Sequence, residues 1–347
     1  MPSENGIPAE DVAEQRLLIP QLTEGMARQA AEIPGLRRRQ LRIFRWIDRL
    51  KECGKRFLAP HLDCLEQYPA RPLAVPRYYR KLPSLLSPPR ISIVTPSFNH
   101  ADYLEHTLKS VLDQNYPNLE YIVQDGASTD ETVSILERYQ ARLACWRSEP
   151  DRGQSSALNL GFRRATGDIL AYLNSDDLLL PGSLHHVAHY FSTHLEVDVI
   201  YGHRIIIDTD NSEVGRWVLP PHNDDVLAWV DFVPQETLFW RRAIWDKIGA
   251  SIDESFQFAM DWDLLLRFRD AGAGFVRLPR FLGAFRLHDL QKTKTQLSGV
   301  GAREMDRLRQ RTFGRRVSDL EIRDHVRPFL RRHVLFRNLY LLGFLGC

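Results

Sequence analysis

Hydrophobic and polar positions follow two different rhythms between residues 90 and 203. Short apolar runs rich in β-branched residues alternate with longer stretches in which apolar residues recur every three or four positions. The short runs predict strands and the longer stretches predict helices. The predicted strands cover residues 91–95, 119–123, 143–148, 169–173 and 197–201. The predicted helices cover residues 101–115, 130–139, 155–165 and 181–194. This alternation predicts an α/β fold with a mostly parallel sheet and helices on its faces.

The alternation stops after His203. Residues 205–217 predict a hairpin with a turn at 208–211, and residues 232–240 predict a further strand. Glycines close two predicted helices, at 243–248 and 264–271. Two late strands are expected at 275–278 and 282–286.

The two ends of the chain differ from its middle in charge. Residues 1–90 and 301–347 each carry a net charge of +6, whereas residues 91–300 carry −10. Residues 1–88 predict a helical extension punctuated by prolines, with an arginine-rich amphipathic stretch at 37–50. Residues 301–347 predict a basic amphipathic tail. Such ends suit an anionic membrane surface, or helices that pack on their own domain or on a second copy.

Composition narrows the class of protein. The four cysteines have no metal-ligand spacing, which argues against a zinc site and favours a reducing compartment. No apolar run is long enough to span a bilayer, and the first residues lack the pattern of a signal peptide. We therefore expect a cytoplasmic location, with the basic ends allowing peripheral contact with the inner face of the cytoplasmic membrane.

Polar residues collect directly after the predicted strands, where a parallel sheet binds its ligands. Phe98 and Asn99 follow the first strand, and Asp125 follows the second. The fourth strand leads into Asp176 and Asp177. Adjacent carboxylates repel each other unless a cation lies beside them, so they suit a divalent ion that carries phosphate oxygens. The alternative is a strand-to-helix turn in which an aspartate caps the helix.

Four motifs resemble those of family-2 glycosyltransferases with the GT-A fold. In order along the chain they are Thr95-Pro96-Ser97-Phe98-Asn99, Gln124-Asp125-Gly126-Ala127-Ser128-Thr129-Asp130, Asn174-Ser175-Asp176-Asp177 with Pro181-Gly182, and Met260-Asp261-Trp262-Asp263-Leu264. The resemblance covers about residues 90–290. It implies a catalytic domain at 89–300, with a nucleotide-sugar-binding half at 89–203 and an acceptor-binding half at 204–300.

The resemblance also implies roles for individual residues. Phe98 would lie on the nucleotide base, for which core packing is the alternative, and Asp125 would bind the base edge. The residues expected to contact the nucleotide-sugar are Pro96, Phe98, Asn99, Asp125, Arg152, Gln154, Asn174 and Ser175. Asp176 would bind a divalent metal, Mn²⁺ or Mg²⁺. His288 resembles a histidine near that metal, and a surface turn is its alternative.

Two positions depart from the family pattern. Asn174 stands where the family has the first aspartate of its Asp-x-Asp motif, and Met260 replaces the glutamate of a Glu-Asp pair. Asp261 remains as the expected general base, because an acceptor hydroxyl must lose its proton as it attacks. Its alternative role is a helix N-cap. The residues expected to support the metal or the acceptor are Asp177, Gln235, Glu236 and Trp262.

The implied function is an inverting, metal-dependent glycosyltransferase that uses a UDP-sugar or a related donor. Its acceptor would be a glycan or a lipid-linked glycan in cell-surface polysaccharide synthesis. A catalytically degenerate binding module of the same fold is one alternative. A sugar-nucleotide nucleotidyltransferase is another, although the loop at 95–100 lacks the basic residues that such an enzyme needs. No motif supports binding of nucleic acid, and a homodimer remains open.

Overall fold

The computed structural model of this chain describes residues 65–289, 291 and 297–346, so the predicted stretch at 37–50 lies outside the described residues. The strands are β1 (Arg71–Pro72), β2 (Ile91–Ser97), β3 (Leu119–Asp125), β4 (Cys145–Ser148), β5 (Ile169–Tyr172), β6 (Leu178–Leu179), β7 (Val199–Ile207), β8 (Ser212–Trp217), β9 (Phe239–Arg241) and β10 (Phe275–Arg286). The α-helices are α3 (Ala101–Leu112), α4 (Thr132–Tyr139), α5 (Gln154–Phe162), α6 (Ser183–Thr193), α7 (Asp224–Leu227), α8 (Arg242–Lys247), α9 (Met260–Asp270), α11 (Ala302–Phe313) and α12 (Asp319–Leu341). The shorter helical turns are η2 (Arg77–Arg80), η3 (Gln140–Arg142), η4 (Gln235–Thr237) and the π-helix η5 (Leu297–Gly301).

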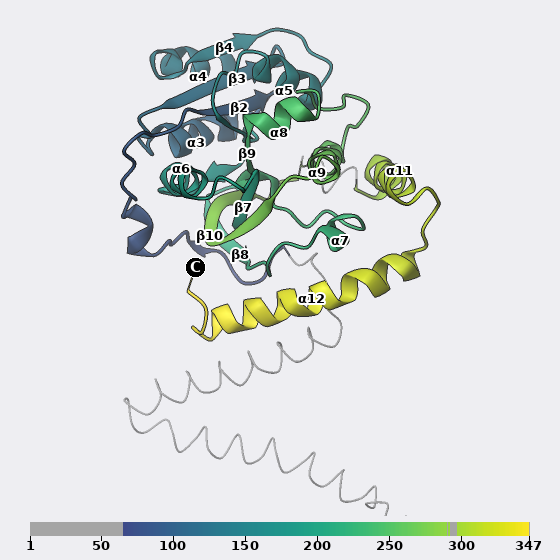
Figure 1. Cartoon of the computed structure of the whole chain (residues 1–347). Helices are drawn as coiled ribbons and strands as arrows, with labels where there is room; N and C mark the ends of the chain where they lie inside the picture. Colours follow the sequence, from purple (N-terminus) through teal and green to yellow (C-terminus); the bar gives the residue numbers. More distant parts are fainter. Residues whose placement is uncertain (1–64, 290, 292–296, 347) are drawn as a thin grey trace, which may run out of the picture. The chain divides into compact units, whose positions relative to one another are not determined.

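The strands of the described residues form one ten-stranded sheet, in which eight strands follow the order β1-β8-β7-β9-β5-β2-β3-β4 and β6 and β10 lie off this path (Figure 1). Strands β5, β2, β3 and β4 are parallel to one another, as the sequence predicts. Antiparallel β9 then joins β5 to β7. Strand β10 runs parallel to β7 and antiparallel to β6.

Alternate residues of the central strands face opposite sides of the sheet, which gives two cores. Ile91 and Ile93 of β2 pack with α3, α4 and α6 on one side. Val94 of the same strand packs with α5, α8 and α9 on the other side, in a core that includes Trp240 and Trp262. The sheet is therefore covered on both faces, and its polar strand ends are left for the site.

The structure differs from the sequence prediction after residue 230. Pro234 cannot donate a backbone hydrogen bond, and its carbonyl accepts from both the amide and the hydroxyl of Thr237, so η4 replaces most of the predicted strand at 232–240. The two late strands are one strand, β10, whose register against β7 shifts on either side of Phe281, close to Pro279. Helix α9 begins at Met260 rather than at Leu264, which places Asp261 in its first turn.

The segment before β2 is fixed to the sheet by Tyr79. This side chain is fully buried, and its hydroxyl accepts a hydrogen bond from the Phe281 amide at 2.9 Å. The guanidinium of Arg280 lies 3.7 Å from the centre of the Tyr79 ring. The proline-rich segment at residues 69–89 therefore forms an arm that packs on β10.

Helices α11 and α12 pack on the same face as α9 (Figure 1). Leu308 of α11 is fully buried in the core. Val326 and Phe329 of α12 lie in the same core and are 5% and 4% exposed. Ser318 and Glu321 form a capping box at the start of α12. Within the described residues, no helix is both long enough and apolar enough to cross a membrane.

Candidate functional site

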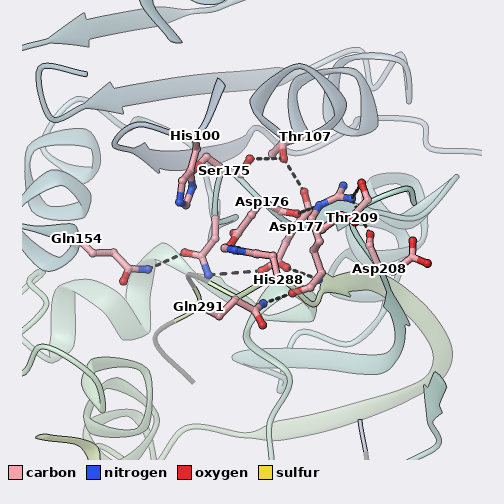
Figure 2. Close-up of polar contacts among 12 residues, drawn as sticks. His100, Thr107, Gln154, Ser175, Asp176, Asp177, Asp208, Thr209, His288 and Gln291 are labelled. Atoms are coloured by element: carbon pink, nitrogen blue, oxygen red, sulfur yellow. Dashed lines mark hydrogen bonds and ion pairs between the residues drawn. The ribbon is translucent and has the colours of Figure 1, made fainter. Parts of the chain in front are cut away.

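The turn at residues 174–177, here called the acidic loop, connects β5 to β6. Thr107 of α3 holds its backbone, because the Thr107 hydroxyl lies 2.9 Å from the Ser175 carbonyl and 2.8 Å from the Asp177 carbonyl (Figure 2). The amide of Asp177 also donates to the Asn174 carbonyl at 3.1 Å. These contacts fix the backbone, so the side chains of the loop leave it in defined directions.

Asp176 and His288 face each other across the site (Figure 2). Nε2 of His288 lies 2.9 Å from Oδ2 of Asp176. Burial acts to raise the pKa of Asp176, but the hydrogen bond with His288 and the nearby His100 outweigh it, so the pKa is lowered. A carboxylate oxygen and an imidazole nitrogen at this separation could both turn toward one divalent cation.

This pair supplies two protein ligands. Among the residues that the structure describes, no group of three or more His, Cys, Asp or Glu side chains could hold a metal ion. A cation beside Asp176 and His288 would therefore need further oxygen ligands from water or from a bound phosphate, as hard cations at phosphate sites commonly have.

Asp177 supports the loop from inside. Its side chain is buried, and its Oδ1 accepts the backbone amide of Arg286 at 3.0 Å. Burial raises the pKa of Asp177 well above its ordinary value, and the negative charges of Asp176 and Glu236 raise it further. Asp177 therefore does not share the exposure that a ligand of an incoming cation needs.

Arg286 ties the acidic loop to the β7–β8 turn. Its Nε donates to the Asp176 carbonyl at 2.7 Å, and its guanidinium also bonds the Asp208 carbonyl and Oδ1 of Asn211 at 3.0 and 2.7 Å. The side chain is fully buried. The sequence prediction missed Arg286, although it lies two positions before His288.

A chain of side-chain amides crosses the site. Nε2 of Gln154 donates to Oδ1 of Asn174 at 2.7 Å, and Nδ2 of Asn174 donates to Oε1 of Gln235 at 3.0 Å. Gln235 in turn donates to the Tyr172 carbonyl at 2.8 Å. The amide of Asn174 both donates and accepts here. An aspartate could not make both bonds, which gives a physical reason for this departure from the family pattern.

The loops expected to hold a base lie beside this edge. Phe98 is 59% exposed, so the alternative of core packing does not apply. A Cβ built on Gly126 would lie 3.3 Å from the Phe98 ring and 3.0 Å from Oδ2 of Asp151, which shows how closely the three residues approach. Asn99 adopts a positive φ of 52°, and its side chain accepts the Thr129 amide at 2.9 Å.

Asp125 is fully buried between two serines. Its carboxylate accepts from the amide and hydroxyl of Ser128 at 2.9 and 2.5 Å, and from the hydroxyl of Ser148 at 2.6 Å. Pro96 lies within β2 and is buried. Ser175 is also buried, and its hydroxyl lies 2.7 Å from Nδ1 of His100, a residue that the sequence prediction missed.

Arg152 lies at the outer rim. Its side chain is 79% exposed and forms a two-pronged contact with Oε2 of Glu254, at 3.1 Å from Nε and 2.7 Å from Nη2. This pair links the 151–154 loop to the segment that leads into α9. The guanidinium remains largely in solvent, where it can also meet an anion.

Asp261 lies in the first turn of α9, where its Oδ1 accepts the Trp262 amide at 2.9 Å. Trp262 itself is buried, and its indole donates to the Leu227 carbonyl at 2.8 Å, so it packs in the core, as does Trp240. Glu236 is also buried and pairs with Arg204, at 2.9 and 2.5 Å.

A second aspartate, Asp231, lies within electrostatic reach of Asp261. Burial raises the pKa of Asp231 well above its ordinary value, and the charge of Asp261 raises it further. Burial also raises the pKa of Tyr172, and the charges of Asp261 and Asp231 raise it further. The buried hydroxyl of Tyr172 has no hydrogen-bond partner among the described residues. The prediction missed Asp231, since nothing local separates it from an ordinary loop residue.

Comparisons with known proteins follow this geometry. Residues 92–265 match the sequence model described as Glycosyl transferase family 2. An uncharacterized glycosyltransferase of Mycobacterium tuberculosis is 33% identical over 187 residues, which cover 53% of this chain and 70% of the relative. A putative teichuronic acid biosynthesis glycosyltransferase of Bacillus subtilis, TuaG, is 42% identical over 92 residues, covering 26% of this chain and 36% of that protein.

Solved structures share the fold. Residues 1–349 of TarS of S. aureus, in complex with UDP-GlcNAc, match with a TM-score of 0.53 and 18% identity, over 73% of this chain and 75% of that TarS chain. The mannosyltransferase PcManGT from Pyrobaculum calidifontis, in complex with GDP-Man and Mn²⁺, matches with a TM-score of 0.52 and 19% identity, over 84% and 81% of the two chains. These likenesses confirm the predicted GT-A type of α/β fold.

Proposed function

Because the chain belongs to glycosyltransferase family 2, we propose that it is an inverting enzyme that moves a sugar from a nucleoside-diphosphate sugar to a hydroxyl group of an acceptor. One observation carries the proposal. The pair of Asp176 and His288 lies on the strand-end edge of the sheet, and the chain that follows the neighbouring strand β2 presents the exposed ring of Phe98. A diphosphate and a base need these two elements at one edge.

The donor would lie along this edge. Phe98 offers an exposed ring face for the base. Asp125 stays the proposed contact for the base edge, although its carboxylate is buried and accepts hydrogen bonds from Ser128 and Ser148 in the free protein. Gln154 and Asn174 lie between this end and the sugar end of the site. A UDP-sugar is our first choice of donor, in keeping with the UDP-GlcNAc in TarS, and GDP-Man in PcManGT marks the second.

Asp176 and His288 would hold the divalent cation, Mn²⁺ or Mg²⁺. When bound, such an ion stabilises the charge of a leaving diphosphate. The chain's own contribution is to keep both side chains in place. Thr107 and Arg286 do so by donating hydrogen bonds to backbone carbonyls of the acidic loop. Arg152, at the exposed rim, would meet the phosphates from the solvent side.

Asp261 would act as the general base. It takes the proton from the acceptor hydroxyl as the oxygen attacks the anomeric carbon, and the bond to the diphosphate breaks on the opposite face. A single displacement of this kind inverts the anomeric centre. Gln235 and Glu236 lie on the acceptor side, where the buried pair of Glu236 and Arg204 fixes the wall of the site.

The acceptor class is a glycan or a lipid-linked glycan in the synthesis of a cell-surface polysaccharide. Support comes from TuaG, whose name places it in teichuronic acid biosynthesis. The alternatives are a binding module without catalysis and a sugar-nucleotide nucleotidyltransferase. Release of UDP or GDP from a nucleotide-sugar would exclude the first, and formation of a nucleotide-sugar from a sugar phosphate would establish the second.

The basic tail would place this reaction at an anionic membrane surface. Arg323, Arg327, Arg331 and Arg332 of α12 are exposed, and Leu335 and Phe344 follow them at 46% and 75% exposure. Cosedimentation of the full chain with vesicles of anionic phospholipid at low salt tests this. A chain that stays in the supernatant would contradict membrane contact, and its size in solution would then show whether the helices join two copies.

The central experiment is a panel of nucleotide-sugars tested with and without Mn²⁺, by thermal shift and by release of UDP or GDP. A donor that binds only the folded state must raise the melting temperature. Asp261→Asn should keep donor binding and lose transfer. Asp270→Asn, at the other end of α9, is the matched control. Transfer by Asp261→Asn at near the wild-type rate would remove Asp261 from the role of base.

A further inference from the structure

Glu304, in the first turn of α11, is bonded to the chain immediately before α9. Its carboxylate accepts three backbone amides: Gln257 at 2.8 Å through Oε1, and Phe258 and Ala259 at 2.9 Å each through Oε2. The side chain is only 8% exposed. Three hydrogen bonds from backbone amides to one buried carboxylate form a strong and directional contact.

This contact lies directly before α9. Helix α9 begins after Ala259, and this residue has no side chain that could accept a hydrogen bond from the first turn. The amides at a helix start lack partners within the helix, and the partial positive charge there attracts an anion. Glu304 therefore holds the N-cap residue of α9 and the two residues before it from a different helix, which fixes the path of the chain into α9.

Helix α11 is itself fixed on α9 and on its surroundings. Nη1 of Arg311 lies 2.5 Å from Oδ1 of the fully buried Asp263, and Arg309 donates to the Trp229 carbonyl at 2.9 Å. A Cβ on Gly301 would come within 2.8 Å of the Phe258 ring, so the start of α11 lies against the same segment. The carboxylate of Glu304 is thus held rather than merely near.

The segment that Glu304 holds ends two residues before Asp261. The direction of the Asp261 side chain depends on the backbone of this first turn, which Trp262 anchors from the inner side through its buried indole. We propose that Glu304 is a positioning residue for Asp261, so that the C-terminal helices complete the catalytic site. The inference rests on the proposed role of Asp261 as the base.

The test compares Glu304→Ala and Glu304→Gln with Glu321→Gln, a glutamate that caps α12 in the same tail and does not touch α9. The affinity for the UDP-sugar and the number of its binding sites are measured by titration calorimetry. The kcat of sugar transfer is then expressed per donor site. We expect Glu304→Ala to lower kcat on the order of 100-fold, since a shift of about 1 Å in a reacting group has such an effect. Donor affinity should stay within about twofold.

Glu304→Gln should lose less activity, because its amide oxygen still accepts while its NH₂ group opposes the neighbouring amides. It also covers the case in which Glu304→Ala does not fold. The inference would be overturned if both folded variants kept the wild-type kcat per donor site. If Glu304→Ala does not fold, a wild-type kcat per donor site in Glu304→Gln alone would overturn it. A loss equal to that of Glu321→Gln would also overturn it.

Two further variants separate this inference from the proposed function. Should Asp261→Asn retain transfer, the base assignment fails whatever Glu304 does. Should Asp261→Asn lose transfer while the Glu304 variants keep it, only the positioning role fails. In the Asp261→Asn background, Glu304→Ala should cause little additional loss of the residual rate, because residues that act through one another are not additive.

Discussion

Nε2 of His288 lies 2.9 Å from Oδ2 of Asp176, although 112 positions separate the two residues in the chain. Strand pairing brings them together: β6 follows the acidic loop directly and pairs antiparallel with β10, with Leu178 opposite Ala284. The two side chains therefore come from distant parts of the sequence and meet where β10 ends. This relationship makes His288 testable as a cation ligand.

His288→Ala should weaken the binding of a donor in the presence of Mn²⁺ about 10- to 100-fold, the range measured when contacts around bound metals are removed. Without Mn²⁺, wild type and variant should differ much less. Titration calorimetry of UDP-sugar with and without Mn²⁺ measures both. His189→Ala, an exposed histidine of α6, is the control. Equal dependence on Mn²⁺ in wild type and His288→Ala would rule out His288 as a ligand.

Asn174→Asp should reduce the free energy of unfolding by about 1–3 kcal/mol, because a buried acceptor on Gln235 loses its donor. It also places a second carboxylate beside Asp177, whose Oδ2 lies 3.5 Å from Nδ2 of Asn174. Urea denaturation measures the change. Asn223→Asp is the matched control, because Asn223 only accepts a bond, from the Val226 amide. An equal effect of both substitutions would contradict the need for a donating group at position 174.

Phe98→Ala should weaken donor binding by about 1–3 kcal/mol, the usual contribution of an aromatic ring stacked on a base. The stability of the free protein should change little, since the ring is already 59% exposed. Phe344→Ala, another exposed phenylalanine at 75%, should leave donor affinity unchanged. Wild-type affinity in Phe98→Ala would mean that the base binds elsewhere.

His333 makes the docking of α12 sensitive to acid. Burial lowers its pKa from 6.5 to about 4, with the charge of Arg337 adding to the effect. As the pH falls, the histidine of the unfolded state takes up its proton before the buried His333 does. The free energy of unfolding is therefore unaffected by His333 above pH 6.5 and decreases as the pH falls toward 4, by on the order of 3 kcal/mol in all.

His333→Phe cannot become charged and should flatten the fall in stability between pH 6.5 and 4. Unfolding by urea at a series of pH values measures this slope. His189→Phe, at an exposed site, should keep the wild-type slope. If His333→Phe also keeps it, the acid sensitivity arises from other buried histidines, such as His203, whose pKa burial lowers well below its ordinary value.

The parallel half of the sheet could be predicted because its signals are local. Each strand from β2 to β5 is a short run that ends in polar residues; β2, β3 and β4 lie side by side in chain order, and β5 returns to pair with β2. The second half could not be predicted equally well. Pro234 turns a strand-like sequence into η4, and the residues that lead into α9 are held by a carboxylate that lies 45 residues away.

The same distinction holds for the site. Phe98, Asp176 and Asp261 belong to motifs and could be named from the sequence. His100, Arg286, Asp231 and Glu304 have no such motif. Their importance comes from contacts made across the fold, as between Arg286 and the Asp208 carbonyl, 78 positions apart. Burial also decided against an exposed role for Trp262, which the sequence alone left open.

The burial of Tyr79 sets limits on how this protein can be divided. A fragment cut to residues 92–265, where the family match begins and ends, would lose the buried ring of Tyr79 and would end inside α9. It would also lack β10, Glu304 and His288. A fragment designed for crystallography or for domain exchange should therefore begin before Leu65 and extend through α12.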